Sequence, residues 1–96
     1  MNEIRFDWDP RKASSNEKKH GVAFEEAQSV FFDEQALLLE DQQPRHEEER
    51  FVLLGLSASL RILVVIHAVR EEDLIRIISA RKATRLETRE YENRLS

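Results

Sequence analysis

Apolar and polar residues alternate in blocks along this chain, and each block predicts one structural element. Residues 4–8 alternate with a period of two, which is typical of a half-buried strand. Asp9 and Pro10 follow, and an N-cap aspartate before a first-turn proline is a strong signal for the start of a helix. This helix is expected to end near His20, because Gly21 suits the left-handed conformation that terminates helices.

A second helix is predicted by Phe24, Ala27 and Phe31, whose spacing places three apolar side chains on one face. Four apolar segments of strand length follow, and short polar turns separate the last three. Short turns imply that these strands pair as antiparallel hairpins. The four segments cover residues 36–39, 50–56, 61–69 and 74–80, and residues 40–49 are predicted to form an exposed loop.

In the third of these segments, residues 62–69 are apolar at both odd and even positions, which predicts a central strand covered on both faces. Residues 82–95 are rich in good helix formers and predict a C-terminal helix. The predicted order is therefore β-α-α-β-β-β-β-α. It defines an α+β fold with a small antiparallel sheet of four or five strands, two N-terminal helices and one C-terminal helix. We expect residues 1–96 to form a single domain.

Composition and charge restrict the possible functions. The chain has no cysteine, which excludes disulfides, thiolate metal ligands and a cysteine nucleophile. No apolar stretch approaches the length of a membrane span and the N-terminus lacks a signal-peptide core, so we expect a cytoplasmic protein without membrane contact. The net charge is −4, yet residues 74–89 carry five basic groups against one acidic group. Such a cationic section on an acidic protein is a candidate site for an anionic partner.

Two arginines in this section are the first candidates for anion binding. Arg76 lies inside an apolar strand, and its planar donor fork suits a carboxylate or a phosphate. It could instead pair with Glu49 or another acid across the sheet. Arg81 is predicted to share one helix face with Arg85 and Arg89. A straight strand would place Arg76 and Arg81 on opposite faces of the sheet, so they converge only if the chain turns near residues 79–80.

Three further side chains each have two interpretations. His67, in the central strand, could be a general acid or base, or a satisfied core residue. His20 could act likewise, although its place at a helix end is already explained by the helix dipole. Tyr91 could stack on a base or touch a phosphate, or it could pack the last helix onto the sheet. No metal-ligand spacing and no glycine-rich phosphate loop is present, so no metal or cofactor is expected.

Several short motifs occur in order along nearly the whole chain. They are Phe6-Asp-Trp-Asp9, Lys19-His-Gly-Val22, Phe24-Glu-Glu-Ala27, Leu63-Val-Val65 with His67, and Ile75-Arg-Ile-Ile-Ser-Ala-Arg81 with Ala83-Thr84, Glu87 and Tyr91. Together these motifs resemble the BrnT family of type II toxin–antitoxin toxins. Ala23 stands where this pattern leads us to expect a serine or threonine that caps the second helix.

The resemblance implies a fold similar to the RelE and ParE toxins and a ribonuclease that shuts down translation. It also implies neutralisation by a BrnA antitoxin with a ribbon-helix-helix DNA-binding part, in a heterotetramer that contacts operator DNA only through the antitoxin. RNA cleavage by attack of its own 2′-hydroxyl needs no metal, but it needs an acid, a base and cations. The expected catalytic residues are Arg76, Arg81, His67, His20 and Tyr91, and the expected RNA-binding residues are Lys19, Lys82, Arg85 and Arg89.

Two other classes of function remain open at this point. The chain could be a non-catalytic binding module, either a ParE-like toxin directed at gyrase or a degenerate toxin that acts as a co-repressor with its antitoxin. The absence of a clear acid–base pair favours that reading. A stand-alone DNA-binding protein fits least, because the net charge is negative and no helix-turn-helix pattern is convincing.

Overall fold

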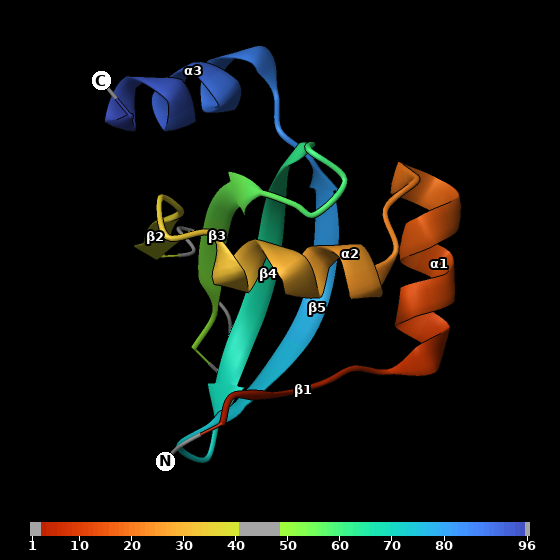
Figure 1. Cartoon of the computed structure of the whole chain (residues 1–96). Coiled ribbons are helices and arrows are strands. Elements are labelled where there is room, and N and C mark those ends of the chain that lie inside the picture. Colours follow the sequence, from red (N-terminus) through yellow and green to blue (C-terminus); the bar gives the residue numbers. More distant parts are fainter. Residues whose placement is uncertain (1–2, 41–48, 96) are drawn as a thin grey trace.

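The computed structural model describes residues 3–40 and 49–95, and its elements follow the predicted order (Figure 1). The predicted α+β class is confirmed. Residues 41–48 of the predicted loop lie outside the described residues. The elements are β1 (Arg5–Asp7), α1 (Pro10–His20), α2 (Phe24–Ser29), the 3-10 turn η1 (Val30–Phe32), β2 (Leu37–Glu40), β3 (Phe51–Leu56), β4 (Ile62–Arg70), β5 (Leu74–Lys82) and α3 (Arg85–Arg94).

The five strands form one sheet in the order β1-β5-β4-β3-β2. Strands β2 to β5 pair antiparallel as predicted, and β4 is the central strand, as its apolar residues at both parities indicated. Strand β1 adds a feature that the pattern did not predict, because it pairs with β5 in parallel. A parallel pair needs a long crossover connection, and the whole chain between β1 and β5 supplies it.

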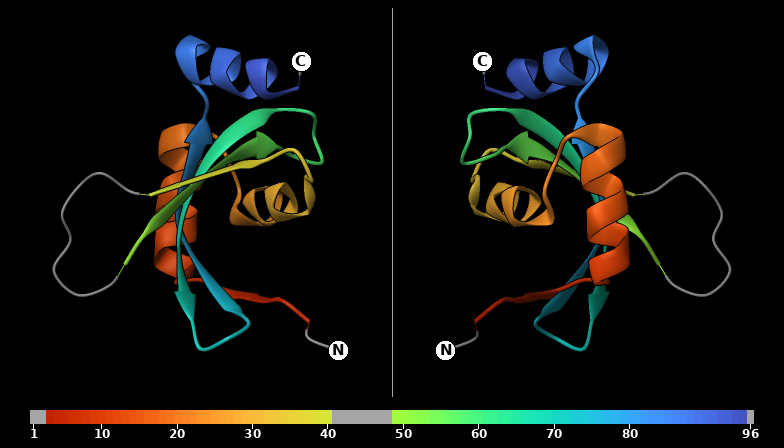
Figure 2. Two further views of the ribbon diagram at one scale, coloured as in Figure 1. Left: turned by 90° about the vertical axis from the view of Figure 1, so that its left-hand side faces the viewer. Right: turned by 90° about the vertical axis from the view of Figure 1, so that its right-hand side faces the viewer.

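The sheet separates two apolar clusters. The larger cluster contains Phe24, Leu63 and Val65 and lies against α1 and α2, whereas the smaller contains Val64 and Tyr91 and lies beneath α3. Figure 2 shows α2 and α3 on opposite sides of the sheet. Successive residues of a strand point to opposite faces, so membership of a cluster identifies the face to which each β4 or β5 residue belongs.

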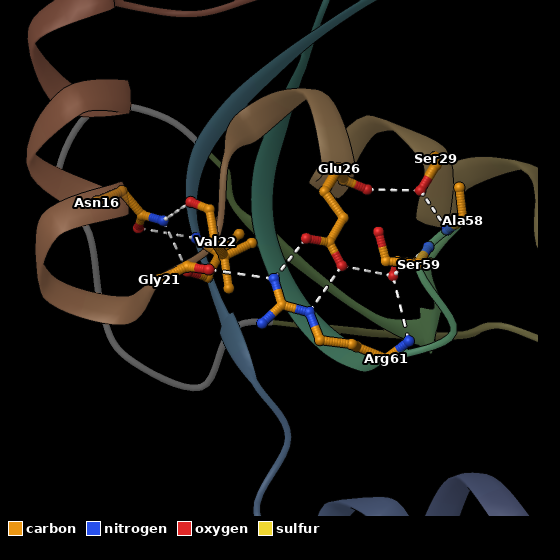
Figure 3. A network of polar contacts seen from close by, with 10 residues as sticks. Asn16, Gly21, Val22, Glu26, Ser29, Ala58, Ser59 and Arg61 are labelled. Atoms are coloured by element: carbon orange, nitrogen blue, oxygen red, sulfur yellow. Dashed lines mark hydrogen bonds and ion pairs between the residues drawn. The ribbon is translucent and has the colours of Figure 1, made fainter.

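Helix α1 is held to the sheet by hydrogen bonds rather than by an apolar stripe. It begins at Asp9, whose side chain accepts from the Arg11 backbone at 2.8 Å, and it ends at Gly21, which adopts φ 69°. The buried Asn16 amide donates to the Val22 carbonyl at 3.0 Å and to the Ala80 carbonyl at 2.8 Å (Figure 3). Its Oδ1 accepts from the Ala80 N–H at 3.0 Å. Asn16 therefore pairs with the backbone N–H and C=O of Ala80 at the edge of β5, as the backbone of a neighbouring strand would.

A second polar network fixes the turn between β3 and β4 (Figure 3). The Arg61 guanidinium donates to both carboxylate oxygens of Glu26 and to the Gly21 carbonyl, and the Ser57 hydroxyl donates to Glu26 at 2.6 Å. The hydrogen bonds from Arg61 lower the pKa of Glu26 below its ordinary value, against the effect of burial. The network ties this turn to α2 and to the end of α1.

Gly55 in β3 allows the segment after α2 to approach the sheet. A Cβ at this position would lie 2.9 Å from the Ala36 Cβ and 2.9 Å from the Val30 Cγ1. Atoms do not normally come so close, so a larger residue would push the η1 segment away from β3. The glycine thus sets how closely the larger core packs.

Helix α2 lacks a side-chain cap, as the sequence indicated. Its N-cap residue Ala23 has the extended backbone of a normal N-cap but forms no side-chain hydrogen bond. Replacing Ala23 with serine is expected to raise the free energy of unfolding by about 1 kcal/mol, because the new hydroxyl can accept from a first-turn N–H. Urea denaturation of both proteins would measure this difference. Equal midpoints would show that the first-turn donors are already satisfied.

The predicted start of the last helix is wrong by three residues. Strand β5 continues to Lys82, and α3 begins at Arg85 behind the N-cap residue Thr84. A capping box sets this boundary: the Thr84 hydroxyl accepts from the Glu87 backbone at 3.1 Å, and the Glu87 carboxylate accepts from the Thr84 backbone at 2.8 Å. Arg81 therefore lies in the strand and does not share a helix face with Arg85 and Arg89.

Candidate functional site

A β-bulge in β5 brings Arg76 and Arg81 to the same face of the sheet. The register of β4 and β5 shifts between Ile66 and His67, so that Arg76 pairs with Ala68 while Arg81 pairs with Val64. Ala68 and Val64 are four residues apart on β4 and therefore share a face. No turn occurs near residues 79–80, so the convergence that the sequence left conditional is achieved by the extra residue of the bulge instead.

The two arginines lie along the strand rather than side by side. Four residues of β4 separate their partners, which corresponds to about 13 Å along the sheet. Ser79 lies between them, and its pairing with Ile66 places it on the same face. We call this surface, defined by Arg76, Ser79 and Arg81, the arginine face. An extended anionic chain could contact both guanidinium groups at once, whereas a small single anion would meet only one.

Arg76 is paired with an acid of the neighbouring strand, as one of its two interpretations predicted. Its Nε donates to Asp7 Oδ1 at 3.1 Å and its Nη2 donates to Asp7 Oδ2 at 3.0 Å. The partner is Asp7 of β1, which stands opposite Arg76 in the parallel register, and not the exposed Glu49. Both side chains remain 38% exposed, so the pair fixes the guanidinium at the surface without burying it.

Arg81 is held more firmly and keeps one donor edge unused. Its Nη1 and Nη2 donate to the two oxygens of Glu87 at 2.8 Å and 2.9 Å, and Nη1 also donates to the Lys82 carbonyl. A guanidinium has five N–H donors. The Nε–H and the second Nη2–H of Arg81 have no acceptor among the described residues, and Nε is not buried. This unused fork matches the spacing of two phosphate oxygens.

The Arg81–Glu87 pair makes the free energy of unfolding depend on pH. The hydrogen bond from Arg81 is the main cause that lowers the pKa of Glu87 from 4.5 to about 2. Because the folded pKa is depressed, the pair stabilises the fold above pH 4.5, and this contribution is lost as the pH falls toward 2. The unfolding free energy of wild type should exceed that of Glu87→Gln near neutral pH by on the order of 1 kcal/mol, after screening at this partly exposed pair.

Denaturation curves of both proteins between pH 2 and 7 would measure how this difference shrinks. Glu90→Gln, a matched change on an exposed position of α3, is expected to follow the wild type throughout the range. A difference between wild type and Glu87→Gln that stays constant with pH would contradict the depressed pKa.

Arg50 is a third cation at this surface that sequence reasoning did not single out. It directly precedes β3, and continuing the register of Phe51 with His67 places it beside Ala68, on the side of Arg76. Its Nε is buried and has no acceptor within residues 3–40 and 49–95. The position of Arg50 beside Arg76 depends on the register between β3 and β4, which the sequence alone does not give. A shift of one residue in that register would place Arg50 on the opposite face of the sheet.

His67 lies on the other side of the sheet, away from the arginine face. It is 3% exposed and packs against the rings of Phe31 and Phe51, with centroid distances of 4.8 Å and 6.0 Å. Burial lowers the pKa of His67, because the charged imidazolium is poorly solvated there. The structure thus places His67 in the core, as its second interpretation expected, but not as a fully satisfied residue, because its buried Nδ1 has no hydrogen-bond partner among the described residues.

Tyr91 is also buried, at 5% exposure, in the cluster beneath α3. Its hydroxyl donates to Asp33 at 2.7 Å, and the same Asp33 oxygen accepts from the Leu56 backbone at 2.8 Å. Burial, together with this hydrogen bond, raises the pKa of Tyr91 to about 12. The ring anchors α3 to the sheet and is not presented for stacking on a nucleotide.

The remaining predicted residues lie on three other surfaces. Lys19 and His20 are exposed on α1, where they line a groove of about 200 Å³ together with Ser79 of the arginine face. Lys82 pairs with Leu63 and so points to the opposite face of β5. Arg85 and Arg89 are exposed on α3, one turn apart. The structure therefore brings Lys19 and His20 to a groove that shares Ser79 with the arginine face, whereas Lys82, Arg85 and Arg89 do not line this groove.

No three His, Asp or Glu side chains within residues 3–40 and 49–95 come together in an arrangement that could hold a metal ion. In the same part of the chain, no helix is long and apolar enough to cross a membrane. What the described residues do present is a sheet surface with a row of guanidinium groups, beside a polar helix.

A small mixed sheet with two helices before it, one helix after it and a cationic face defines a compact α+β domain suited to an anionic polymer. A family model described as the ribonuclease toxin BrnT of type II toxin–antitoxin systems matches residues 8–87. The chain therefore belongs to the BrnT family of ribonuclease toxins, and membership of a type II system implies an antitoxin partner.

A solved structure has the same fold. The crystal structure of the Brucella abortus ribonuclease toxin BrnT superimposes with a TM-score of 0.62 at 24% sequence identity, over 88% of this chain and 100% of that one. A comparison with curated proteins found no match. The family resemblance expected from the sequence is thereby confirmed, and the α+β arrangement of elements matches that of this BrnT structure.

Proposed function

We propose that this chain is a metal-independent endoribonuclease that cleaves RNA on the arginine face and thereby inhibits translation. The bulge in β5 carries the proposal, because it sets Arg76 and Arg81 on one exposed surface. In this reaction the 2′-oxygen bonds to the adjacent phosphorus while the bond from phosphorus to the 5′-oxygen breaks. Negative charge then develops on the phosphorane oxygens, where preorganised cations stabilise it.

Arg81 is the principal charge-stabilising group in the proposal. Glu87 holds its guanidinium in place, so its unused fork does not have to be ordered when the substrate arrives. Arg76 contacts a neighbouring phosphate and fixes the register of the strand. Tyr91 acts indirectly, by holding α3 and with it Glu87 against the sheet.

His20 is the proton-transfer group that fits this arrangement. It is the exposed imidazole of the described residues and lines the groove that contains Ser79 of the arginine face. His20 takes the proton of the 2′-hydroxyl, and the departing 5′-oxygen receives a proton from solvent. The products are a 2′,3′-cyclic phosphate and a 5′-hydroxyl. The buried His67 takes no part in the step.

The proposal extends to the partner that membership of a type II system implies. The antitoxin is of the BrnA type, with a ribbon-helix-helix part that dimerises and binds operator DNA, so that the complex is a heterotetramer. It neutralises the toxin in the cytoplasm by covering the arginine face. A purified complex that cleaved RNA as fast as the free toxin would contradict this occlusion.

Cleavage of RNA by the purified chain in the presence of EDTA tests the proposed reaction. The expected result is cleavage that persists in EDTA, yields 2′,3′-cyclic phosphate ends, and stops when the nucleotide before the cut carries a 2′-deoxy sugar. Cleavage that requires added metal would contradict the mechanism. Growth arrest with intact RNA and induced DNA-damage response would instead support the gyrase-directed alternative, and no growth effect would support a degenerate toxin.

A further inference from the structure

Helix α1 has a charge and an anchoring that core packing does not explain. It carries four basic residues against the single acidic Glu17, on a protein whose net charge is −4. Its only buried residue is Asn16, whose amide is fully used in holding the helix to Val22 and Ala80. The other polar residues of α1 are not buried in the core, so packing does not explain why they are where they are. The surface that they form is therefore a candidate binding site.

One side of this helix forms a groove with β5. The groove has a volume of about 200 Å³, and its lining includes Lys12, Ser15, Lys19 and His20 from α1 with Ile78 and Ser79 from β5. No acidic residue lines it. Neither Lys12 nor Lys19 forms an ion pair with another described residue. Two lysines without an ion-pair partner among the described residues and two serines thus line one groove.

The groove shares Ser79 with the arginine face. Ile78 is the extra residue of the bulge, and Ser79 lies between Arg76 and Arg81 on the same strand. Helix α1 lies alongside β5, and both run in the same direction (Figure 1). Lys12 and Lys19 are seven residues apart, or about 10 Å along the helix axis, so they cannot neutralise the same phosphate. Two cationic rows therefore run side by side with Ser79 between them.

We propose that the groove between α1 and β5 is a second binding site for the RNA backbone, where Lys12 and Lys19 contact phosphates of nucleotides that flank the cleaved bond. This inference rests on the proposed function for its ligand, a single-stranded phosphodiester chain. The lysines supply sequence-independent attraction, since compact ammonium groups act as point charges on phosphates. Ser15 and Ser79 supply hydroxyl donors within the same channel.

Binding of a 2′-O-methyl RNA oligonucleotide, which cannot be cleaved, tests the site. Affinity is measured by fluorescence anisotropy at several salt concentrations for wild type, Lys12→Gln/Lys19→Gln and Arg11→Gln/Lys18→Gln. The last is a matched control, because it removes the same two charges from neighbouring positions of the same helix. For the groove variant, the slope of log K against log salt concentration is expected to be less steep than that of wild type by about 1.4, because two phosphate contacts are missing. Between 50 and 200 mM salt, the affinity of this variant should therefore fall by a factor roughly sevenfold smaller than the factor for wild type. The control is expected to keep the wild-type slope.

Equal losses in both variants would overturn the inference, because they would show only a general effect of charge. An unchanged slope in the groove variant, or no binding by wild type, would overturn it as well. Loss of antitoxin binding with intact RNA binding would assign the groove to the partner. The two proposals fail separately: wild type that binds the analogue through the groove yet cleaves no RNA refutes only the cleavage mechanism.

Discussion

Replacing Arg81 with alanine is expected to lower the rate of RNA cleavage at saturating substrate by roughly 10²–10³-fold, the usual effect of removing one preorganised donor from a transition state. The guanidinium is positioned by two hydrogen bonds to Glu87, and its remaining fork is directed at no other described residue. Single-turnover cleavage of a defined RNA would measure this loss. Arg81→Lys should recover only part of the rate, because an ammonium keeps the charge but loses the planar fork.

The fold should survive this substitution. The capping box of α3 uses Thr84 and Glu87 and does not require the guanidinium. Arg11→Ala, a matched loss of one guanidinium on the exposed surface of α1, is expected to cleave at the wild-type rate. Full activity in Arg81→Ala with a native circular dichroism spectrum would exclude Arg81 from the reaction, even if the wild-type chain were confirmed as a ribonuclease.

Asn16→Ala is expected to destabilise the protein by about 3 kcal/mol, a large part of the stability of a domain of this size. The substitution leaves buried groups of Ala80 and Val22 without their partners. Helix α1 has almost no apolar side chain to compensate, so its attachment to β5 depends on this one amide. Thermal and urea denaturation would measure the loss.

Asn16→Asp provides a control with a distinctive dependence on pH. A carboxylate would face the Val22 and Ala80 carbonyls, so the folded protein requires the neutral acid and its pKa must rise above the unfolded value of about 3.9. With a raised folded pKa, the variant is most stable below pH 4 and loses stability as the pH increases. A variant equally stable at pH 4 and pH 7 would show that Asn16 is not buried against these carbonyls.

The sequence predicted the elements well where the signals were local. Asp9, Pro10 and Gly21 determine α1 through side-chain and backbone preferences that act within a few residues, and the structure has the helix between them. The central position of β4 was predicted correctly, because its residues are apolar at both odd and even positions. The parallel pairing of β1 with β5 did not follow, because it depends on contacts between residues about seventy positions apart.

The candidate site was harder to predict because it depends on one irregular residue. Strict alternation along β5 puts Arg76 and Arg81 on opposite faces, and the bulge at Ile78 reverses that result. The sequence Ile75-Arg-Ile-Ile78 does not show which of its residues is the extra one. The boundary between β5 and α3 was missed for a related reason: good helix formers around Lys82 outweighed the capping signal of Thr84 and Glu87.

The roles of His67 and Tyr91 could not be decided from the sequence alone. A histidine and a tyrosine in apolar surroundings fit both a catalytic and a packing role, and only burial separates these roles. His67 sits among aromatic rings on the α2 side of the sheet, whereas Tyr91 donates to Asp33 beneath α3. His20, which was explained by its place at a helix end, is the exposed imidazole of the described residues and lines a groove with Ser79.

The position of β5 along the chain also determines when the sheet can be completed during synthesis. This strand is the last of the five to be translated, yet Asp7 and Asn16 form hydrogen bonds with it across 69 and 64 residues. Before it emerges, β1 has no strand to pair with and Asn16 lacks its partner Ala80, so neither β1 nor α1 can take its place against β5. A prematurely terminated product that ends before residue 74 lacks both arginines and the strand that holds them.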